Sequence, residues 1–284
     1  MKSALVMQTD FGVDNLSVAT MRGVAMIVDP ELRVFDATHA INQFDVLAAS
    51  DALIYTIPFW PEGTVFVSVV DPGVGTARRG CVAKLNNGSF VVTPDNGSLT
   101  AILDWVVAVR EIDESVNRLK GSDKANSFHG RDVFAYTAAR LASGIINFEG
   151  VGPEYPVNEI VTFETTHGTV APGRAEGEIA GCTKHFGGVG TNIDVDEFEK
   201  TGIVYGDMTH VTIVKNGETL FDRDVLYHKS FGFVPEGEPI LYNGSTTPTI
   251  ALSLNKRSFA EKFLTHIFDT GENFGDYKIT IVKK

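Results

Sequence analysis

Residues 69–80 read VVDPGVGTARRG, and the rest of the chain is organised around this stretch. It begins at the end of an apolar run, residues 64–70, and continues as a loop rich in Gly. The loop carries one carboxylate, Asp71, and two guanidiniums, Arg78 and Arg79. In α/β proteins, a strand followed by an irregular charged loop commonly presents a site at the carboxyl end of the sheet. The stretch therefore predicts an α/β fold with a site beside Asp71.

The composition is that of a globular protein, with 43% hydrophobic and 21% charged residues. At 284 residues the chain exceeds the usual size of one hydrophobic core, so we expect two domains. The formal net charge of −12 argues against a nucleic-acid partner, which needs a basic face for phosphate contacts. It is compatible with a cationic ligand, although an acidic balance is also common among ordinary cytosolic proteins.

Cysteine usage and apolar runs indicate the compartment. Cys81 and Cys182 lie far apart and form no CxxC motif, which favours a reducing compartment over a disulfide scaffold or a zinc site. The apolar run near the N-terminus, residues 4–8, is too short for a signal peptide. No segment approaches the ~18 apolar residues that a membrane span needs. We therefore expect a soluble, cytoplasmic protein without a membrane partner.

Strand and helix patterns alternate over the first half of the chain. Strands are expected at residues 4–8, 33–36, 64–70, 81–85, 89–93 and 106–112, and helices at residues 16–28, 45–55, 99–105 and 130–143. The tripeptide Asn86-Asn87-Gly88 is a strong hairpin signal between two of these strands. Such alternation is typical of an α/β layer fold.

The pattern changes after residue 150. Residues 150–176 are rich in Gly and Pro, and we expect a linker there. Short strands are then expected at residues 177–181, 192–195, 204–205, 210–214, 219–221, 239–242, 249–254 and 278–282, with a helix at residues 259–268. The sequence thus predicts an α/β N-terminal domain, residues 1–165, and a smaller, mostly β, barrel-like C-terminal domain, residues 172–284.

Four polar segments in the first domain are candidates for a site: residues 9–12, 71–79, 93–97 and 127–132. The first three follow predicted strands, and parallel strands bring such loops to one edge of a sheet. Each segment also has a plainer explanation, since an Asp after a strand often caps a helix or forms a turn. The glycines do not form a phosphate loop, because no Lys-Ser/Thr follows and no GxGxxG opens a helix.

His129 lies just before a predicted helix, between Phe128 and Gly130. An isolated histidine is usually a surface or satisfied core group, and metal binding is not expected because no second histidine lies at ligand spacing. A His with an Asp and an Arg can instead hold and polarise a water molecule, with the Arg as a fixed charge. Ser98 and Ser127 are candidate nucleophiles by residue type only, since no GxSxG surrounds them.

Four motifs together resemble those of a known family. They are TDFG at 9–12, VDPGVGTARR at 70–79, TPDNGSLT at 93–100 and FHGRDVF at 128–134. In this order they resemble the S-adenosyl-L-methionine hydroxide adenosyltransferases, formerly called domain of unknown function 62 and related to the fluorinase and chlorinase enzymes. The fold of that family, an α/β domain followed by a smaller β domain, agrees with the patterns above.

The resemblance implies hydrolysis of S-adenosyl-L-methionine to adenosine and L-methionine, with water or hydroxide attacking the ribose C5′ and with no metal or other cofactor. In the family an Asp–Arg–His set handles that water, and the matching positions here are Asp71, Arg78 and His129. Arg78 is preferred over Arg79 because it lies at the family's spacing from the Asp. The related halogenases lack this set, so its presence favours hydrolysis over halogenation.

The resemblance also implies substrate-binding residues in both domains. In the first, Asp10 matches the carboxylate that bridges the two ribose hydroxyls, and Asn15 and Ser17 fall where the family has polar groups near the sugar. The second domain is expected to contribute adenine and methionine-end recognition. The matching residues there are Phe186, Asn192 and Ser245.

The second domain departs from the family at two positions. Lys184 or Thr183 stands where the family has an Asp, and Gly188 replaces an Asn. The loss of an acidic group leaves two alternatives open. One is a substrate with a different S-substituent, and the other is a substitute carboxylate from Asp194, Asp196 or Glu197.

The family further implies a homotrimer, in which the ligand lies between the first domain of one subunit and the second domain of its neighbour. Two other functions stay open. The same scaffold can transfer the adenosyl group to a halide, as the chlorinase and fluorinase do. It can also hold an adenosyl ligand without turnover, as a binding module.

Overall fold

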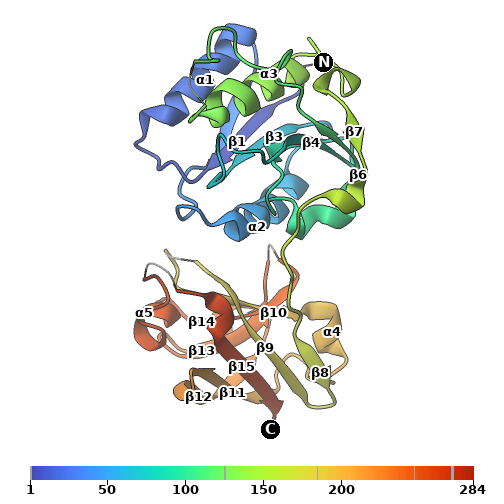
Figure 1. Ribbon diagram of the computed structural model, residues 1–284. Helices are drawn as coiled ribbons and strands as arrows, with labels where there is room; N and C mark the ends of the chain where they lie inside the picture. The colour runs from blue at the N-terminus through green and yellow to red at the C-terminus, as the bar shows by residue number, and fades with distance from the viewer. Residues whose placement is uncertain (1, 125, 184, 246, 270–271) are drawn as a thin grey trace. The chain divides into compact units, whose positions relative to one another are not determined.

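The computed structural model of this chain describes residues 2–124, 126–183, 185–245, 247–269 and 272–284. Lys184, one of the positions that depart from the family, lies outside the described residues. The chain divides into two compact units, Met1–Glu164 and Thr165–Lys284 (Figure 1). Among the described residues, no helix combines the length and the apolar character that crossing a membrane requires.

The first unit is built on a seven-stranded sheet in the order β2-β1-β3-β5-β4-β6-β7. The strands are β1 (Leu5–Thr9), β2 (Val34–Thr38), β3 (Val65–Val69), β4 (Gly80–Leu85), β5 (Phe90–Pro94), β6 (Val106–Glu111) and β7 (Glu154–Tyr155). The pairs β1–β2, β1–β3 and β3–β5 are parallel, whereas β4 pairs antiparallel with β5 and β6. The hairpin at residues 86–88 reverses the chain, so the sheet is mixed.

Helices cover both faces of this sheet: α1 (Leu16–Val28) and α3 (Tyr136–Ala142) on one, α2 (Val46–Thr56) on the other (Figure 1). Leu5 and Met7 of β1 belong to the core beneath α1 and α3, while Val6 between them belongs to the core on the α2 side. Burial on both faces explains why β1 reads as a continuous apolar run. Short helical turns complete the unit: η1 (Ile57–Phe59), η2 (Thr100–Trp105), η3 (Gly130–Ala135, a π-helical turn), η4 (Glu149–Val151) and η5 (Val157–Glu159).

The expected linker at residues 150–176 is wrong for much of its length. Strand β7 pairs with β6, and Val151 and Ile160 are buried in the first unit. Strand β8 (Thr169–Ala171) pairs with β9 of the second unit. Elements of two or three residues are too short to leave a periodic pattern in the sequence.

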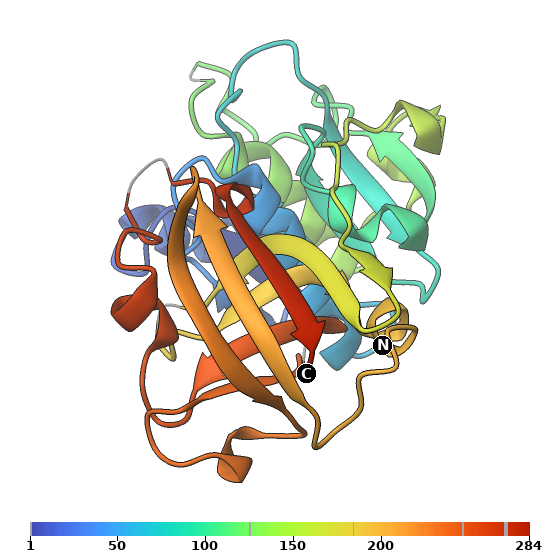
Figure 2. The same cartoon turned by 90° about the horizontal axis from the view of Figure 1, so that it is seen from below.

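The second unit is a closed, seven-stranded β-barrel (Figure 2). Its strands are β9 (Arg174–Cys182), β10 (Val189–Asp194), β11 (Met208–Lys215), β12 (Glu218–Tyr227), β13 (Pro239–Asn243), β14 (Thr249–Leu254) and β15 (Tyr277–Lys283). The pairing of β9 with β10 closes the barrel, and β8 extends it at β9. Buried residues alternate with less buried ones along β10, as a barrel wall requires. The predicted fold class, α/β followed by a β barrel, is confirmed.

Details of the second unit differ from the expectation. The strand expected at residues 204–205 is wrong, because these residues form a turn that leads into β11. Helix α4 (Val195–Glu199) was not predicted, and it begins where Asp194 accepts hydrogen bonds from two backbone N–H groups. Helix α5 is shorter than expected, at Phe259–Phe263. The remaining turns are η6 (Phe231–Phe233) and η7 (Phe274–Asp276).

Candidate active site

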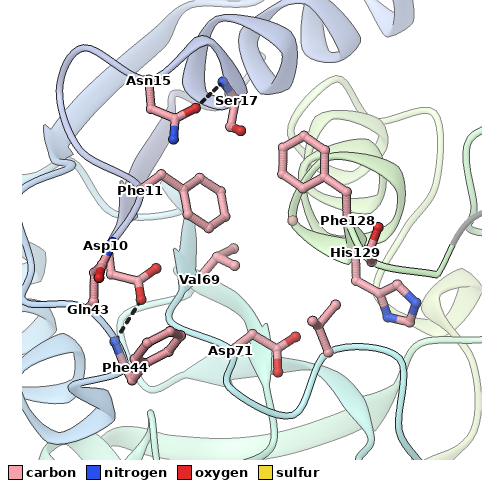
Figure 3. Close-up of a pocket in the computed structure, with 13 residues that line it drawn as sticks. Asp10, Phe11, Asn15, Ser17, Gln43, Phe44, Val69, Asp71, Phe128 and His129 are labelled. Carbon is pink, nitrogen blue, oxygen red and sulfur yellow. Dashed lines mark hydrogen bonds between the residues drawn. The ribbon is translucent and has the colours of Figure 1, made fainter.

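A cavity of about 480 Å³ lies beyond the carboxyl ends of β1 and β3 in the first unit. Figure 3 shows Asp10 and Phe44 on one side of it, Phe128 and His129 on the opposite side, and Asp71 between them. The lining residues come from the segments that follow β1, β2 and β3 and from the segment that enters η3. They are Asp10, Phe11, Asn15, Ser17, Gln43, Phe44, Val69, Asp71, Val74, Ser127, Phe128, His129 and Gly130.

Arg78 joins Asp71 to His129. Its Nε donates a hydrogen bond to Oδ1 of Asp71 at 2.9 Å, and its Nη2 pairs with Oδ2 of the same carboxylate. The same Nη2 lies 3.1 Å from Nδ1 of His129. Asp71 and His129 line the cavity, whereas Arg78 is not among the described lining residues. The structure therefore brings the three predicted residues together, with Arg78 as the bridge.

This geometry fixes the tautomer of His129. A guanidinium can only donate hydrogen bonds, so Nδ1 of His129 accepts the bond from Arg78. In the neutral ring the proton then lies on Nε2, which is buried and has no hydrogen-bond partner within the described part of the chain. Burial lowers the pKa of His129, which favours this neutral form.

Neighbouring charges modify that effect. The carboxylate of Glu114 raises the pKa of His129, whereas the guanidiniums of Arg78 and Arg118 lower it. Asp71 also raises it, as the smallest of these contributions. Two carboxylates and two guanidiniums thus surround one imidazole, and the net direction is downward.

Close backbone packing holds the Asp71 loop against the segment that carries His129. Gly75 has a φ of +77°, and a Cβ added there would lie 2.8 Å from the carbonyl oxygen of Asn126. Only glycine adopts this conformation readily and also leaves room for that approach. Gly75, the second glycine of GVG at 73–75, therefore has a structural reason: it lets the Asp71 loop approach the backbone of Asn126.

Asp10 lies on the other side of the cavity. Its Oδ2 accepts a hydrogen bond from the backbone N–H of Phe44 at 2.9 Å. Phe44 has a φ of +66°, a conformation that is uncommon for a bulky residue and that clusters at ligand sites. Asp10 does not cap α1, because Asn15 does so by accepting from the N–H of Ser17 at 2.8 Å. Asn15 and Ser17 also line the cavity.

Residues 93–97, the third candidate segment, do not appear in the described lining of the cavity. Asp95 is buried and accepts hydrogen bonds from Nε of Arg79 at 3.1 Å, from Oη of Tyr155 at 3.1 Å and from the N–H of Val161 at 2.8 Å. The guanidinium of Arg79 also lies 4.1 Å from the centre of the Tyr155 ring. Arg79 and Asp95 therefore fasten the segment around Tyr155 to the sheet.

Three predicted residues belong to the second unit. Phe186 is 81% exposed, and Ser245 is also exposed. Asn192 accepts a hydrogen bond from the N–H of Glu178 at 2.9 Å and donates to the carbonyl of Thr166 at 3.2 Å. The oxygen and the nitrogen of its amide thus both have hydrogen-bond partners within the second unit.

At one of the two departures from the family pattern, Gly188, the backbone packs closely against Ser253. A Cβ added at Gly188 would lie 2.3 Å from Oγ of Ser253, so a larger residue requires that side chain to move. Among the proposed substitute carboxylates, Asp194 caps α4 and Glu197 pairs with Lys200 at 2.5 Å. These two carboxylates therefore already have structural partners.

Several residues of the site were not predicted. Phe11 and Phe128 lie inside the quoted motifs, so their aromatic character was a usable signal. No sequence signal pointed to Gln43 or Phe44, because nothing in the sequence pattern indicates the positive φ of Phe44. Within the described residues, no group of three or more His, Cys, Asp and Glu side chains is placed to hold a metal ion.

Comparison with known proteins identifies the family. Residues 5–152 match the SAM hydroxide adenosyltransferase N-terminal domain, and residues 178–270 match the C-terminal domain of the same name. The chain belongs to the SAM hydroxide adenosyltransferase family. The suspected resemblance is confirmed.

Named relatives and a solved structure agree with this membership. The chain is 34% identical to an (R)-S-adenosyl-L-methionine hydrolase of Thermus thermophilus, over 89% of this chain and 92% of the relative. It is 26% identical to a fluorinase of an Actinoplanes species, over 85% of this chain and 87% of the relative. The crystal structure of an uncharacterized conserved protein from Thermotoga maritima matches with a TM-score of 0.86 and 29% identity, over 98% of this chain and 99% of that one.

Proposed function

We propose that this protein hydrolyses S-adenosyl-L-methionine to adenosine and L-methionine. One observation carries the proposal: Asp71 and His129, joined by Arg78, line a cavity whose other side holds Asp10. The name of the Thermus thermophilus relative supports it.

The reaction needs a positioned oxygen nucleophile more than it needs strong activation. The water oxygen forms a bond to the ribose C5′ while the bond between C5′ and sulfur breaks. The electron pair of that bond stays on sulfur, which changes from a cationic sulfonium to a neutral thioether. One water is consumed and one proton is released. Because the leaving group is already cationic, the proposed step requires no metal or redox cofactor, and in-line placement of the water is the main demand on the protein.

In this scheme Asp71 and His129 face the water, and Arg78 holds both of them in place. A carboxylate oxygen has two lone pairs, so Asp71 can accept from Arg78 and from a water in the cavity. Arg78 supplies a positive charge and fixes the orientations of Asp71 and His129. Asp10 accepts hydrogen bonds from the two ribose hydroxyls, and Phe44 N–H holds its carboxylate in place.

We further propose that the protein is a homotrimer in the cytoplasm and that Phe186, Asn192 and Ser245 of a neighbouring subunit contribute to substrate binding. All described lining residues of the cavity belong to the first unit, which is consistent with a site that another surface completes. Light scattering coupled to size-exclusion chromatography measures the assembly. A monomer at assay concentrations would contradict this part of the proposal.

The function is tested by incubating the purified protein with each sulfur epimer of S-adenosyl-L-methionine and following products by chromatography. Because the named relative is specified for the (R) form, we expect adenosine from that epimer. If neither epimer yields adenosine above the buffer control, the proposal is refuted. Retained ligand without turnover would instead support a binding module, and 5′-chloro-adenosine formed with chloride would support halogenation.

A further inference from the structure

Glu114, a residue that no motif includes, lies close to His129 of the proposed site. It lies between β6 and η3, in the segment that leads toward His129. Its Oε1 is 3.8 Å from Nδ1 of His129, beyond hydrogen-bond distance but within range of a strong charge interaction. Its side chain is 37% exposed, whereas that of His129 is 7% exposed, so the carboxylate borders the buried ring from the solvent side.

Arg118 holds this carboxylate in place. Nη1 of Arg118 donates to Oε2 of Glu114, four residues away in sequence, at 2.8 Å. The guanidinium also donates to Oδ1 of Asn126 at 2.9 Å and to Oγ of Ser122 at 3.2 Å. The Arg118 side chain is 15% exposed. A guanidinium with several partners on one loop holds its carboxylate more rigidly than an isolated surface pair does.

The position of Glu114 matters because of what protonation would do at His129. Nδ1 is the acceptor atom of the neutral ring, so a proton taken up there would point toward Nη2 of Arg78, which is itself a donor. Oε1 of Glu114 lies 3.8 Å from this atom, and both oxygens of Asp71 already accept from Arg78. The groups that act on the ring are Asp71, Arg78, Glu114 and Arg118.

We propose that Glu114, held by Arg118, is a positioning residue for His129: it keeps a carboxylate beside Nδ1 and stabilises the protonated imidazole. This proposal depends on the proposed function only for the part that His129 plays in the reaction. The effect on the imidazole itself is a property of the folded protein without substrate.

The sign of the effect separates this role from a structural one. Loss of the Glu114 charge removes an interaction that raises the pKa of His129, so the pKa should fall further. A substitution that merely loosens the loop admits water to the ring, which weakens the effect of burial and raises the pKa instead. The two explanations therefore predict shifts in opposite directions.

The test follows the ring nitrogens of His129 by NMR across a pH titration of the full protein without substrate. Seven histidines are present, and His129→Gln assigns the signal by its loss. Glu154→Gln is the matched control, because it removes an Arg–Glu pair of the same 2.8 Å length, with Arg110, in the same unit. Before titration the expected spectrum is that of a neutral ring with its proton on Nε2.

In Glu114→Gln, and also in Glu114→Ala, we expect the His129 titration to move to lower pH than in the wild type, while Glu154→Gln leaves it unchanged. An unchanged or upward-shifted titration in folded Glu114 variants would overturn the proposal. Turnover is measured separately, and its pH dependence is expected to move to lower pH in Glu114→Gln. Because the NMR readout needs no substrate, absence of turnover in the wild type would refute the proposed function without deciding the role of Glu114.

Discussion

Arg78 binds the carboxylate of Asp71 through two nitrogen atoms, and one of these also reaches Nδ1 of His129, 51 positions along the chain. A single guanidinium therefore fixes both cavity-lining groups of the proposed water site. This arrangement depends on the planar fork of arginine, because an ammonium group cannot make the two parallel bonds to the carboxylate.

Replacement of Arg78 by Lys tests that dependence. Lys keeps the positive charge but has one nitrogen, so Asp71 and His129 lose their common partner. We expect kcat to fall about 100-fold with little change in KM, because orientation of the water suffers more than substrate binding. Arg79→Lys is the control, since Arg79 binds Asp95 away from the cavity. An Arg78→Lys variant with wild-type kcat would rule out the bridging role.

Replacement of Asp10 by Asn tests the ribose-binding side. The amide oxygen can still accept from Phe44 N–H, but one of the two acceptor oxygens and the charge are lost. We expect adenosine to bind about 10- to 100-fold more weakly, which corresponds to about one hydrogen bond to a charged group. Calorimetric titration with adenosine measures this change. Unchanged affinity in the Asn variant would remove Asp10 from the substrate site.

Replacement of Gly75 by Ala tests the packing between the two site loops. The added methyl meets a backbone carbonyl at 2.8 Å and the φ is +77°, so both a clash and backbone strain arise. We expect a loss of about 2–4 kcal/mol in the free energy of unfolding, together with reduced activity. Gly88→Ala is the control at a similar φ of +79°, with no atom within 4 Å of the added carbon, and should cost about 1 kcal/mol. Equal losses from denaturant titrations of both variants would contradict the close approach.

The sequence was informative where elements are long and where motifs mark strand ends. The helix predicted at residues 16–28 coincides with α1, because its apolar period and the Asp29-Pro30 end are both local signals. The convergence of Asp71 and His129 was inferred from a family pattern, and the structure shows that Arg78 joins them. No local signal indicates that Gly75 packs on Asn126, since such an approach depends on tertiary structure.

Tertiary contacts also explain why the sequence patterns put residues 93–97 at the site and left Glu114 out. Residues 93–97 follow a strand like the other candidate loops, yet Asp95 binds Arg79 and Tyr155 instead of lining the cavity. Strand β5 is parallel to β3, so residues 93–97 do reach the same edge of the sheet, where Asn96 donates to the carbonyl of Val70 at 2.9 Å. The Asp95 carboxylate, however, accepts from the N–H of Val161 and so attaches residues 154–161 to the sheet. Glu114 was missed because it acts through a neighbour 15 residues away and belongs to no motif.

His39 gives a pH dependence of stability. Its side chain is buried, Nδ1 lies 2.9 Å from Oγ1 of Thr9, and Nε2 lies 3.1 Å from Oδ1 of Asp36. Burial, with a smaller contribution from the charge of Arg22, lowers the pKa of His39 from 6.5 to about 4. The unfolded state therefore binds more protons than the folded state between these values, so stability rises with pH through this window. The contribution of His39 is fully present above pH 6.5 and is lost as the pH falls toward 4.

Comparison with His39→Gln isolates this contribution. The free energy of unfolding of the wild type should drop, relative to the variant, by at most about 3 kcal/mol between neutral pH and pH 4. The comparison of wild type with variant is needed because burial raises the pKa of Asp51 to about 6, and this makes stability fall as the pH rises. Denaturant titrations at several pH values measure it. Parallel curves for the two proteins would mean that His39 is not held neutral.

The most direct test of the central claim is the source of the oxygen in the product. The protein is incubated with (R)-S-adenosyl-L-methionine in ¹⁸O-labelled water, with halide-free buffer, and adenosine is analysed by mass spectrometry. Attack of water at C5′ predicts one ¹⁸O atom in the 5′-hydroxyl of adenosine, with L-methionine unlabelled, and loss of this product in Asp71→Asn. Adenosine without the label, or labelled adenosine formed equally fast by Asp71→Asn, would contradict the account.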